Sequence, residues 1–418
     1  MNKAINNGYK HTPIPAKQTA GRGTIPAEWN VSTLDDVMAV RSEITQPSAK
    51  GQIKYVGLEH IDSGNPKLKR WGTEAEVRSS KAKFSVGNIL YGKLRPYLDK
   101  VVLAEWEGIC ATDILVFRAK EGESSPEYLV NLLHTDVLLN HAISTTTGVN
   151  HPRTSWHALK RFEFGLPPLP EQRTIAAILF KIQQAIETQE KIIERTKELK
   201  KSLMAKLFTE GLQGEELKET EIGLMPKSWR VVKLGEVSQR RIETVNPLEH
   251  EDEIYIGLEH IESGTTRLKN HGYASEVRSS KNRFFKGDVL YGKLRPYLDK
   301  SVLVDEDGMS SSDILVFTGV RASSQFLVHL VHTASFLKHA IATTTGVNHP
   351  RTSWDALSRF AFGLPTREEQ GEICKVLNAL DDKVELAERK AASLRPLFKS
   401  MLHQLMTGQV RVNNVNVA

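Results

Sequence analysis

A long internal repeat constrains this chain more than any other feature. LYGKLRPYLDK runs from Leu90 to Lys100 and again from Leu290 to Lys300, and EVRSSK, DILVF and TTTGVNHPRTSW also occur twice. The copies are offset by 200 residues, and by 198 after a two-residue deletion. This period is too long for a solenoid, so the sequence predicts one domain and one connector, duplicated in tandem.

Each copy is predicted to hold a globular part and a long helix. Short β-branched runs between Gly and Pro breaks, such as NILYGKLR and ATDILVFRA, predict strands, and Ser125 to Ser144 predicts one helical segment with apolar positions at Leu129, Leu132, Leu133 and Val137. We therefore expect an α+β fold, with two similar α+β domains and two long antiparallel coiled-coil helices related by a pseudo-two-fold axis. The expected boundaries are a tail at 1–25, a domain at 26–168, a helix at 169–211, a linker at 212–225, a domain at 226–364, a helix at 365–409 and a tail at 410–418.

The two connectors carry apolar residues at coiled-coil spacing. The first predicted seam is Ile175, Leu179, Ile182, Ile186, Ile193, Leu203 and Leu207, and the second is Ile373, Leu377, Leu380, Val384, Leu394, Phe398, Met401 and Leu405, with Ala387 and Ala391 between. Alternating steps of four and three residues over several heptads favour paired helices over two helices that each lie on their own domain. Polar Gln189, Thr196 and Lys200 interrupt the first seam.

The ends and breaks of these helices are also encoded. Thr366 and Glu369 form a capping-box pattern, and Pro396 is expected to kink or break the second helix. The polar linker GLQGEELKETEIG contains glycines that let the chain turn, which favours antiparallel pairing. The last residues, Asn413 to Ala418, are short and polar and are expected to fray.

Composition favours a soluble partner of polyanions. The formal net charge is +6 and the pI is about 9.0, an excess that suits nucleic acid without proving it. The only cysteines, Cys110 and Cys374, align with Ser310 and Ala176 in the other copy, so no disulfide framework or four-Cys metal site is encoded. No signal peptide or membrane span is visible, and we expect a cytoplasmic protein.

Motifs of known catalytic chemistry are missing from the sequence. It contains no phosphate-binding loop, no H-E-x-x-H zinc motif, no G-x-G-x-x-G after a strand, and no Asp-Pro-Pro-Tyr or Asn-Pro-Pro-Phe signature of amino-methyltransferases. Four histidines recur in both copies without ligand spacing, as His60 and His260, His134 and His332, His141 and His339, and His151 and His349. We therefore assign no catalytic residue, no metal and no cofactor to this chain.

Three basic or hydroxylic segments recur in each domain, and their chemistry suits DNA. Arg binds guanine and Asn binds adenine in bidentate fashion, whereas Lys, hydroxyls and exposed backbone amides suit phosphate. The DNA-binding candidates in the first copy are Arg78, Ser79, Lys81, Lys93, Arg95, Tyr97, Lys100, Thr145, Thr146, Thr147, Asn150, His151 and Arg153. Those in the second are Arg278, Ser279, Lys281, Lys293, Arg295, Tyr297, Lys300, Thr343, Thr344, Thr345, Asn348, His349 and Arg351. The structural alternative is that Thr145 to Thr147 cap the helix region at Trp156 and that Arg95–Pro96 is only a turn.

Over nearly its whole length the chain resembles the specificity subunits of type I restriction–modification systems. The resemblance is carried by IPAEWNVSTLDDV and MPKSWRVVKLGEV at the starts of the domains, by LYGKLRPYLDK, and above all by FGLPPLPEQRTIAAIL and FGLPTREEQGEICKVL leading into the helices. It implies two target-recognition domains, each reading one half of a split DNA sequence, with the helices as spacer. It also implies two methyltransferase subunits using S-adenosylmethionine and restriction subunits using ATP and Mg as partners, so catalysis lies outside this chain.

The likeness of the two copies departs from the family's common pattern, in which the domains differ. Two alike readers related by a two-fold axis are expected to read the same half-sequence on opposite strands, as an interrupted palindrome with half-sites about one helical turn, or ~34 Å, apart. The copies diverge around Trp71–Glu74 and His271–Ala274, which leaves room for a few base-reading residues to differ. Two other classes stay open from the residues alone: a stand-alone nuclease or methyltransferase, and a coiled-coil scaffold that binds only proteins. Self-association of the free subunit also stays open.

Overall fold

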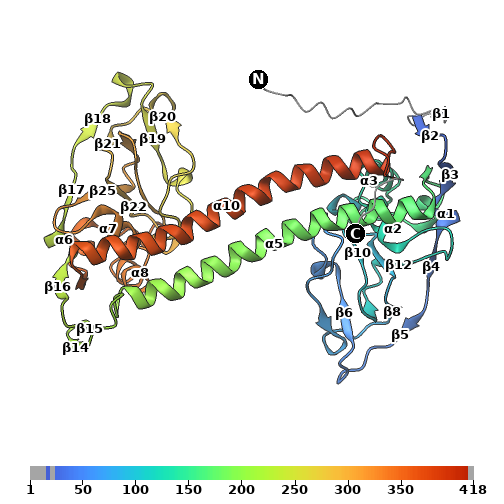
Figure 1. The fold of residues 1–418 in the computed structure, drawn as a ribbon, viewed down its shortest axis with the longest axis horizontal. Coiled ribbons are helices and arrows are strands. Elements are labelled where there is room, and N and C mark those ends of the chain that lie inside the picture. The colour runs from blue at the N-terminus through green and yellow to red at the C-terminus, as the bar shows by residue number, and fades with distance from the viewer. Residues whose placement is uncertain (1–15, 19–23, 413–418) are drawn as a thin grey trace, which may run out of the picture. The chain divides into compact units, whose positions relative to one another are not determined.

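The structure is a computed structural model that describes residues 16–18 and 24–412. Most of the predicted tail at 1–25, and the fraying predicted for Asn413 to Ala418, lie outside the described residues. The described chain contains two α+β domains of one design and two long helices, α5 (Leu169–Leu207) and α10 (Arg367–Met406) (Figure 1). The fold class predicted from the repeat is confirmed in these parts.

The two domains share one order of elements. The first holds strands β3 (Asn30–Thr33), β4 (Met38–Arg41), β5 (Ile44–Thr45), β6 (Lys54–Val56), β7 (Gly72–Thr73), β8 (Lys81–Phe84), β9 (Ile89–Gly92), β10 (Val101–Leu103), β11 (Gly108–Cys110), β12 (Ile114–Ala119) and β13 (Glu163–Leu166), with helices α1 (Leu34–Val37), α2 (Pro126–Leu133), α3 (Asp136–Ser144) and α4 (Trp156–Leu159). The second holds strands β16 (Arg230–Lys233), β17 (Ser238–Arg240), β18 (Thr244–Val245), β19 (Ile254–Ile256), β20 (Gly272–Tyr273), β21 (Lys281–Phe284), β22 (Val289–Gly292), β23 (Ser301–Leu303), β24 (Gly308–Ser310), β25 (Ile314–Gly319) and β26 (Ala361–Leu364), with helices α6 (Leu234–Val237), α7 (Ser324–Leu330), α8 (Ala334–Ala342) and α9 (Trp354–Leu357).

Each domain is built from a four-stranded and a five-stranded sheet. The orders in the first domain are β10-β9-β12-β4 and β5-β8-β11-β6-β7, and the second domain repeats both. All neighbouring strands in these sheets pair antiparallel except β11 with β6 and β24 with β19. The last strand returns to the first, as β13 to β3 and β26 to β16, so each domain closes before its long helix begins.

The helical segment predicted from Ser125 to Ser144 is two helices, not one. α2 ends at Leu133, and Thr135 caps α3 by accepting a hydrogen bond from the amide of Leu138. The Thr135 hydroxyl also donates to the Leu132 carbonyl at 2.7 Å, which satisfies the end of α2. The break leaves Val137 exposed, although periodicity had placed it on the buried face. It also places His134 at the junction of the two helices.

Each long helix contributes to two compact units of the molecule. The first unit consists of two segments, the chain up to Thr188 and the chain from Lys390 onward. The second unit runs from Gln189 to Arg389. Within the first unit, Ile175 and Leu179 near the start of α5 share a core with Leu402 and Leu405 near the end of α10. Within the second, Met204 and Leu207 share a core with Ile373 and Leu377. The start of one helix therefore packs with the end of the other, which is antiparallel pairing.

The predicted seam holds along most of this pairing. The seam residues that are buried are Ile175, Leu179, Ile186, Leu207, Ile373, Leu377, Val384, Ala387, Ala391 and Leu405, and the half-buried ones are Ile182, Ile193, Leu203, Leu380, Leu394, Phe398 and Met401. Polar Thr196 and Lys200 are buried, as their seam positions predict. Near the ends of the helices the buried side chains are Met204 and Leu402, one residue later than predicted, because the helices there also pack on a domain core.

Three details of the long helices and the linker between them differ from prediction. α5 ends at Leu207, and the linker that follows forms the hairpin β14 (Leu217–Thr220) and β15 (Gly223–Pro226), as β1 (Ala16–Gln18) and β2 (Thr24–Pro26) do before the first domain. α10 continues through Pro396, so the predicted break is wrong. The Thr366 hydroxyl accepts from the amide of Glu369, but the Glu369 carboxylate does not complete the capping box, because it accepts from Trp229 and from the Leu212 amide.

Candidate nucleic-acid interface

Two of the three predicted segments meet in each domain. Leu94 and Arg153 form a short antiparallel bridge, the Arg95 amide donates to the Pro152 carbonyl at 2.7 Å, and the Thr154 amide donates to the Lys93 carbonyl at 3.0 Å. The second copy repeats the bridge and both hydrogen bonds between residues 293–295 and 350–352, at the same two distances. The LYGKLRPYLDK and TTTGVNHPRTSW segments are therefore one surface, brought together by backbone hydrogen bonds.

The turn within LYGKLRPYLDK has an unusual backbone. Among the described residues, the non-glycine positions with positive φ are Arg95 (52°), Asp99 (46°), Arg295 (51°) and Asp299 (51°), and all four lie in this motif. Side chains in this left-handed region cost roughly 1–2 kcal/mol per residue, so the surrounding contacts must hold the turn. The result is that Arg95 and Tyr97 stand out from the surface, with Tyr97 53% exposed.

The third predicted segment does not offer its lysine to solvent. Lys81 is buried, donates to the carbonyl and hydroxyl of Ser79 at 2.7 and 2.6 Å, and lies 5.8 Å from the Tyr55 ring. Lys281 is tied in the same way, and burial lowers its pKa. Burial, then nearby Glu259, raises the pKa of Tyr255, whose ring lies 5.8 Å from the Lys281 ammonium group.

Several other candidates also serve the fold. Thr145 and Thr146 donate to carbonyls at the end of α3, and Thr343 and Thr344 do the same at the end of α8. The helix at Trp156 is capped by Ser155 instead, so the predicted partner of these threonines is wrong. Lys100 and Lys300 donate to the carbonyls of Leu58 and Leu258.

Arg153 and Arg351 keep exposed guanidinium groups but are tied to a carboxylate. Each binds both oxygens of an aspartate, Asp113 or Asp313, at about 3.0 and 3.4 Å. The hydrogen bond that each arginine donates to this aspartate raises the pKa of the arginine, so both stay charged.

What remains exposed is a compact set in each domain. The exposed candidates are Arg78, Ser79, Arg95, Tyr97, Thr147, Asn150 and His151, with Arg278, Ser279, Arg295, Tyr297, Thr345, Asn348 and His349 in the second copy, and Lys93 and Lys293 are half-buried beside them. The search for polar and charged residues missed Val149 and Val347, which are 97% and 98% exposed at the tip of the TTTGVNHP loop. The sequence did contain a signal for these two residues, because each is an apolar side chain in a repeated polar loop. Such a side chain suits a thymine methyl group.

The repeated histidines have structural partners rather than ligand geometry. His60 and His260 accept from the amides of Gly57 and Gly257, and His141 and His339 face the carbonyls of Ala158 and Ala356. Within residues 16–18 and 24–412 no group of three His, Cys, Asp or Glu side chains is placed to hold a metal.

The copies differ where their sequences diverge. Lys54 lies 4.2 Å from the Trp71 ring and 4.7 Å from the Trp106 ring in the first domain, whereas His271 packs edge-on against Tyr273 in the second. Lys54 and Tyr55 are neighbours on β6, so their side chains leave opposite faces of the sheet. The aromatic cluster is therefore on the face opposite Tyr55 and Lys81.

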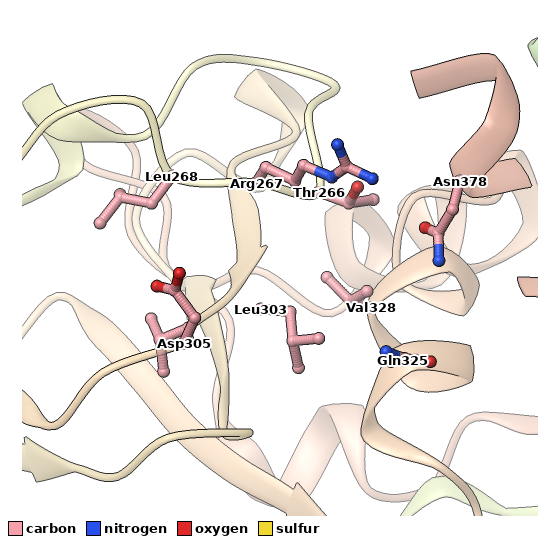
Figure 2. Close-up of a pocket in the computed structure, with 9 residues that line it drawn as sticks. Thr266, Arg267, Leu268, Leu303, Asp305, Gln325, Val328 and Asn378 are labelled. Atoms are coloured by element: carbon pink, nitrogen blue, oxygen red, sulfur yellow. The ribbon is translucent and has the colours of Figure 1, made fainter. Parts of the chain in front are cut away.

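The second unit also contains a cavity of about 290 Å³. Figure 2 shows Gln325 and Val328 from α7, Asn378 from α10, and Thr266 and Arg267 from the loop before β20 around it. In the first copy Phe180 stands in the place of Asn378, and Lys67 lies 4.6 Å from its ring. The cavity is not built from the repeated basic segments.

Across the described residues, no helix is both long and apolar enough to cross a membrane.

The family model for the type I restriction modification DNA specificity domain matches twice, at residues 26–198 and 226–395. A putative type I restriction enzyme MjaX specificity subunit from Methanocaldococcus jannaschii is 26% identical over 93% of this chain and 95% of its own. The EcoDI specificity subunit of Escherichia coli is 29% identical over 44% of this chain and 42% of its own.

Solved structures share the fold. The S subunit of a type I restriction–modification system from M. genitalium has a TM-score of 0.59 at 15% identity, over 90% of this chain and 96% of its own. A chain from a structure of type I system assembly and conformational transition has a TM-score of 0.55 at 18% identity, over 93% of this chain and all of its own. Two matched halves, each running from a domain into its helix, show that this chain belongs to the type I restriction–modification specificity subunits, the non-catalytic DNA specificity component of those complexes.

Proposed function

We propose that the two domains of this specificity subunit read the same half-site on opposite strands of an interrupted palindrome. The observation that carries the proposal is the match of the two exposed surfaces. Arg95 and Arg295 agree to within 1° in φ and ψ, and the contacts that join the two segments agree to within 0.1 Å. Readers of equal shape and chemistry favour equal base sequences.

Within each surface we assign roles by side-chain chemistry. Arg95, Arg78 and Asn150, with Arg295, Arg278 and Asn348, are suited to base edges, because they form bidentate hydrogen bonds with guanine or adenine. Lys93, Thr147 and His151 and their counterparts are suited to phosphates. Val149 and Val347 would contact a thymine methyl group. Arg153 and Arg351, tied to aspartates, would frame the surface.

The helices are proposed to set the distance between half-sites and to dock two methyltransferase subunits, with restriction subunits completing the complex in the cytoplasm. S-adenosylmethionine, ATP and Mg would be used by those partners, and no cofactor is proposed for this chain.

The direct test is to sequence modified bases in DNA from cells that carry this subunit with its methyltransferase. We expect one motif whose two halves are inverted copies around an unread spacer. Two unrelated half-sites would refute equal reading while leaving the family assignment intact.

A gel shift separates DNA reading from the protein-scaffold alternative. The chain with its methyltransferase should bind duplex DNA with an affinity that falls steeply as salt rises, because phosphate contacts release counterions. Binding that is absent at low salt would favour the scaffold.

A further inference from the structure

We propose that His134 and His332 are positioning residues for DNA reading, each holding in place the left-handed turn that carries Arg95 and Tyr97 or Arg295 and Tyr297. The proposal rests on the proposed function, because it assigns the cause of the turn's shape on the same surface. The evidence is the hydrogen bonding of the His134 ring at the junction of α2 and α3.

Both nitrogens of the His134 ring are used. Nδ1 lies 2.8 Å from a carboxylate oxygen of Asp99, and Nε2 lies 2.9 Å from the Val101 carbonyl. Both partners are oxygen atoms, so the ring bridges Asp99 and Val101 and holds the two sides of the end of the turn together. His332 repeats the arrangement with Asp299 and Ser301 at 2.7 and 2.9 Å.

The residue that His134 holds is the second strained position of the turn. Asp99 has φ of 46°, its amide donates to the Pro96 carbonyl, and its own carbonyl accepts from the Gly64 amide at 2.9 Å. Those backbone contacts stay within surface loops. Only the carboxylate reaches the helical layer, through a histidine side chain that is 4% exposed.

The break between α2 and α3 is what makes the clamp possible. A single helix through this segment would keep His134 in regular helical backbone, whereas the actual junction places it at the C-terminal end of α2, and α3 packs on the turn Pro96–Leu98. The clamp, the break and the strained turn recur together in the second copy. No hydrogen-bonding capacity of either ring is left for a ligand.

The test compares specific with nonspecific binding. Wild-type chain with its methyltransferase first selects a duplex from a randomised pool, and the affinity for that duplex is compared with the affinity for a shuffled duplex of the same length. We expect His134→Ala to bind the selected duplex about tenfold more weakly, because Arg95 is no longer held in its reading position. Binding to the shuffled duplex should change less than about threefold, since phosphate attraction needs no exact geometry.

A second variant guards against misfolding. Asp99→Gly removes the other end of the clamp from a position 18% exposed, where no core cavity results and where glycine accepts the φ of 46°. Its loss should match that of His134→Ala, and the double variant should lose no more than either single one, as expected for groups that act as a unit. His141→Ala is the matched control, because it removes a histidine hydrogen bond in the same helix layer, to Ala158, without touching the turn.

Three outcomes overturn the proposal. Folded His134→Ala and Asp99→Gly variants that bind the selected duplex like wild type would show that the clamp does not position Arg95. Equal losses on both duplexes would show a general structural role instead. A wild-type complex that selects no duplex would refute the proposed function itself, and the positioning role with it.

Discussion

The two units agree where they face the proposed DNA site and differ where they are packed behind it. The turn at Arg95 and the turn at Arg295 are nearly superimposable in backbone angles, and both are clamped by a histidine. Behind them, the first unit has Asn131 and Gln183 where the second has His329 and Asp381, with Lys200 bound to that aspartate at 2.5 Å. The turn is therefore alike in the two units, whereas the polar residues packed near α10 differ.

A second difference concerns how the domain starts are held. The Trp29 indole donates to Glu171 at 3.0 Å, and the Trp229 indole donates to Glu369 at 2.8 Å. Glu171 is also bound by both sides of the Arg411 guanidinium, at 2.8 and 2.9 Å, whereas Glu369 accepts from the Leu212 amide.

The Arg411 contact lies in the predicted tail at 410–418. Its first residues are anchored, since Val412 is 4% exposed in the core of the first unit.

The largest expected effect comes from removing that arginine. Arg411→Met leaves the Glu171 carboxylate, 2% exposed, without its charged partner, and breaking a buried pair costs about 3 kcal/mol. We expect the free energy of unfolding of the first unit to fall by about that amount and the second unit to be unchanged. Exposed Arg230→Met is the control.

Thiol labelling measures the unfolding of the two units separately. Cys110 and Cys374 are buried, one in each unit, and burial raises the pKa of each thiol to about 12, so labelling requires unfolding. Arg411→Met should speed the labelling of Cys110 and not of Cys374. Faster labelling at both positions would show that the units unfold together.

Acid should destabilise the second unit more than the first. Burial, then the nearby Lys200 charge, lowers the pKa of His329 to about 4, whereas the unfolded chain titrates near about 6.5. The unfolded state alone takes up the proton as pH falls below about 6.5, so this stability is present at pH 7 and is lost toward pH 4. Between pH 7 and pH 5 the loss is about 2 kcal/mol.

His329→Asn sharpens this comparison by giving the second unit the residue that the first has at Asn131. Urea unfolding at pH 7 and pH 5 measures the effect. The fall in the free energy of unfolding between the two pH values should be about 2 kcal/mol smaller in the variant than in wild type. The same acid dependence in both proteins would place the titration elsewhere.

The two reading arginines should be equivalent. Arg95→Ala and Arg295→Ala are each expected to weaken binding to the selected duplex about tenfold, since a base contact is worth about 1–3 kcal/mol. Competition binding measures both. Losses that differ by more than a few fold would break the likeness of the two surfaces and point to unequal half-sites.

The smallest effect is expected at the loop tips. Val149→Ala and Val347→Ala should each weaken specific binding severalfold without changing stability, because both side chains are almost wholly exposed. Replacing a thymine at each half-site position with uracil in the duplex, which deletes one methyl group, should locate the contact. Equal binding by every uracil-substituted duplex would exclude it.

Much of the architecture was readable from the sequence because it depends on repetition and period. The tandem repeat predicted two like domains, and apolar spacing predicted two paired helices, with Thr196 and Lys200 buried in the seam as their positions require. Turn residues and strand runs placed β9, β10 and β12. These signals are local or periodic, so they survive without knowledge of distant contacts.

The tertiary structure decided which polar residues of the proposed surface are available. Lys81 and Lys100 look like DNA-binding lysines in the sequence, yet the folded chain gives their ammonium groups carbonyl partners. The left-handed turn at Arg95, and the histidine clamp on Asp99 across 35 residues of sequence, follow from contacts between distant segments. Residue type states what a side chain is able to bind, but only the packed neighbours determine whether it is already bound.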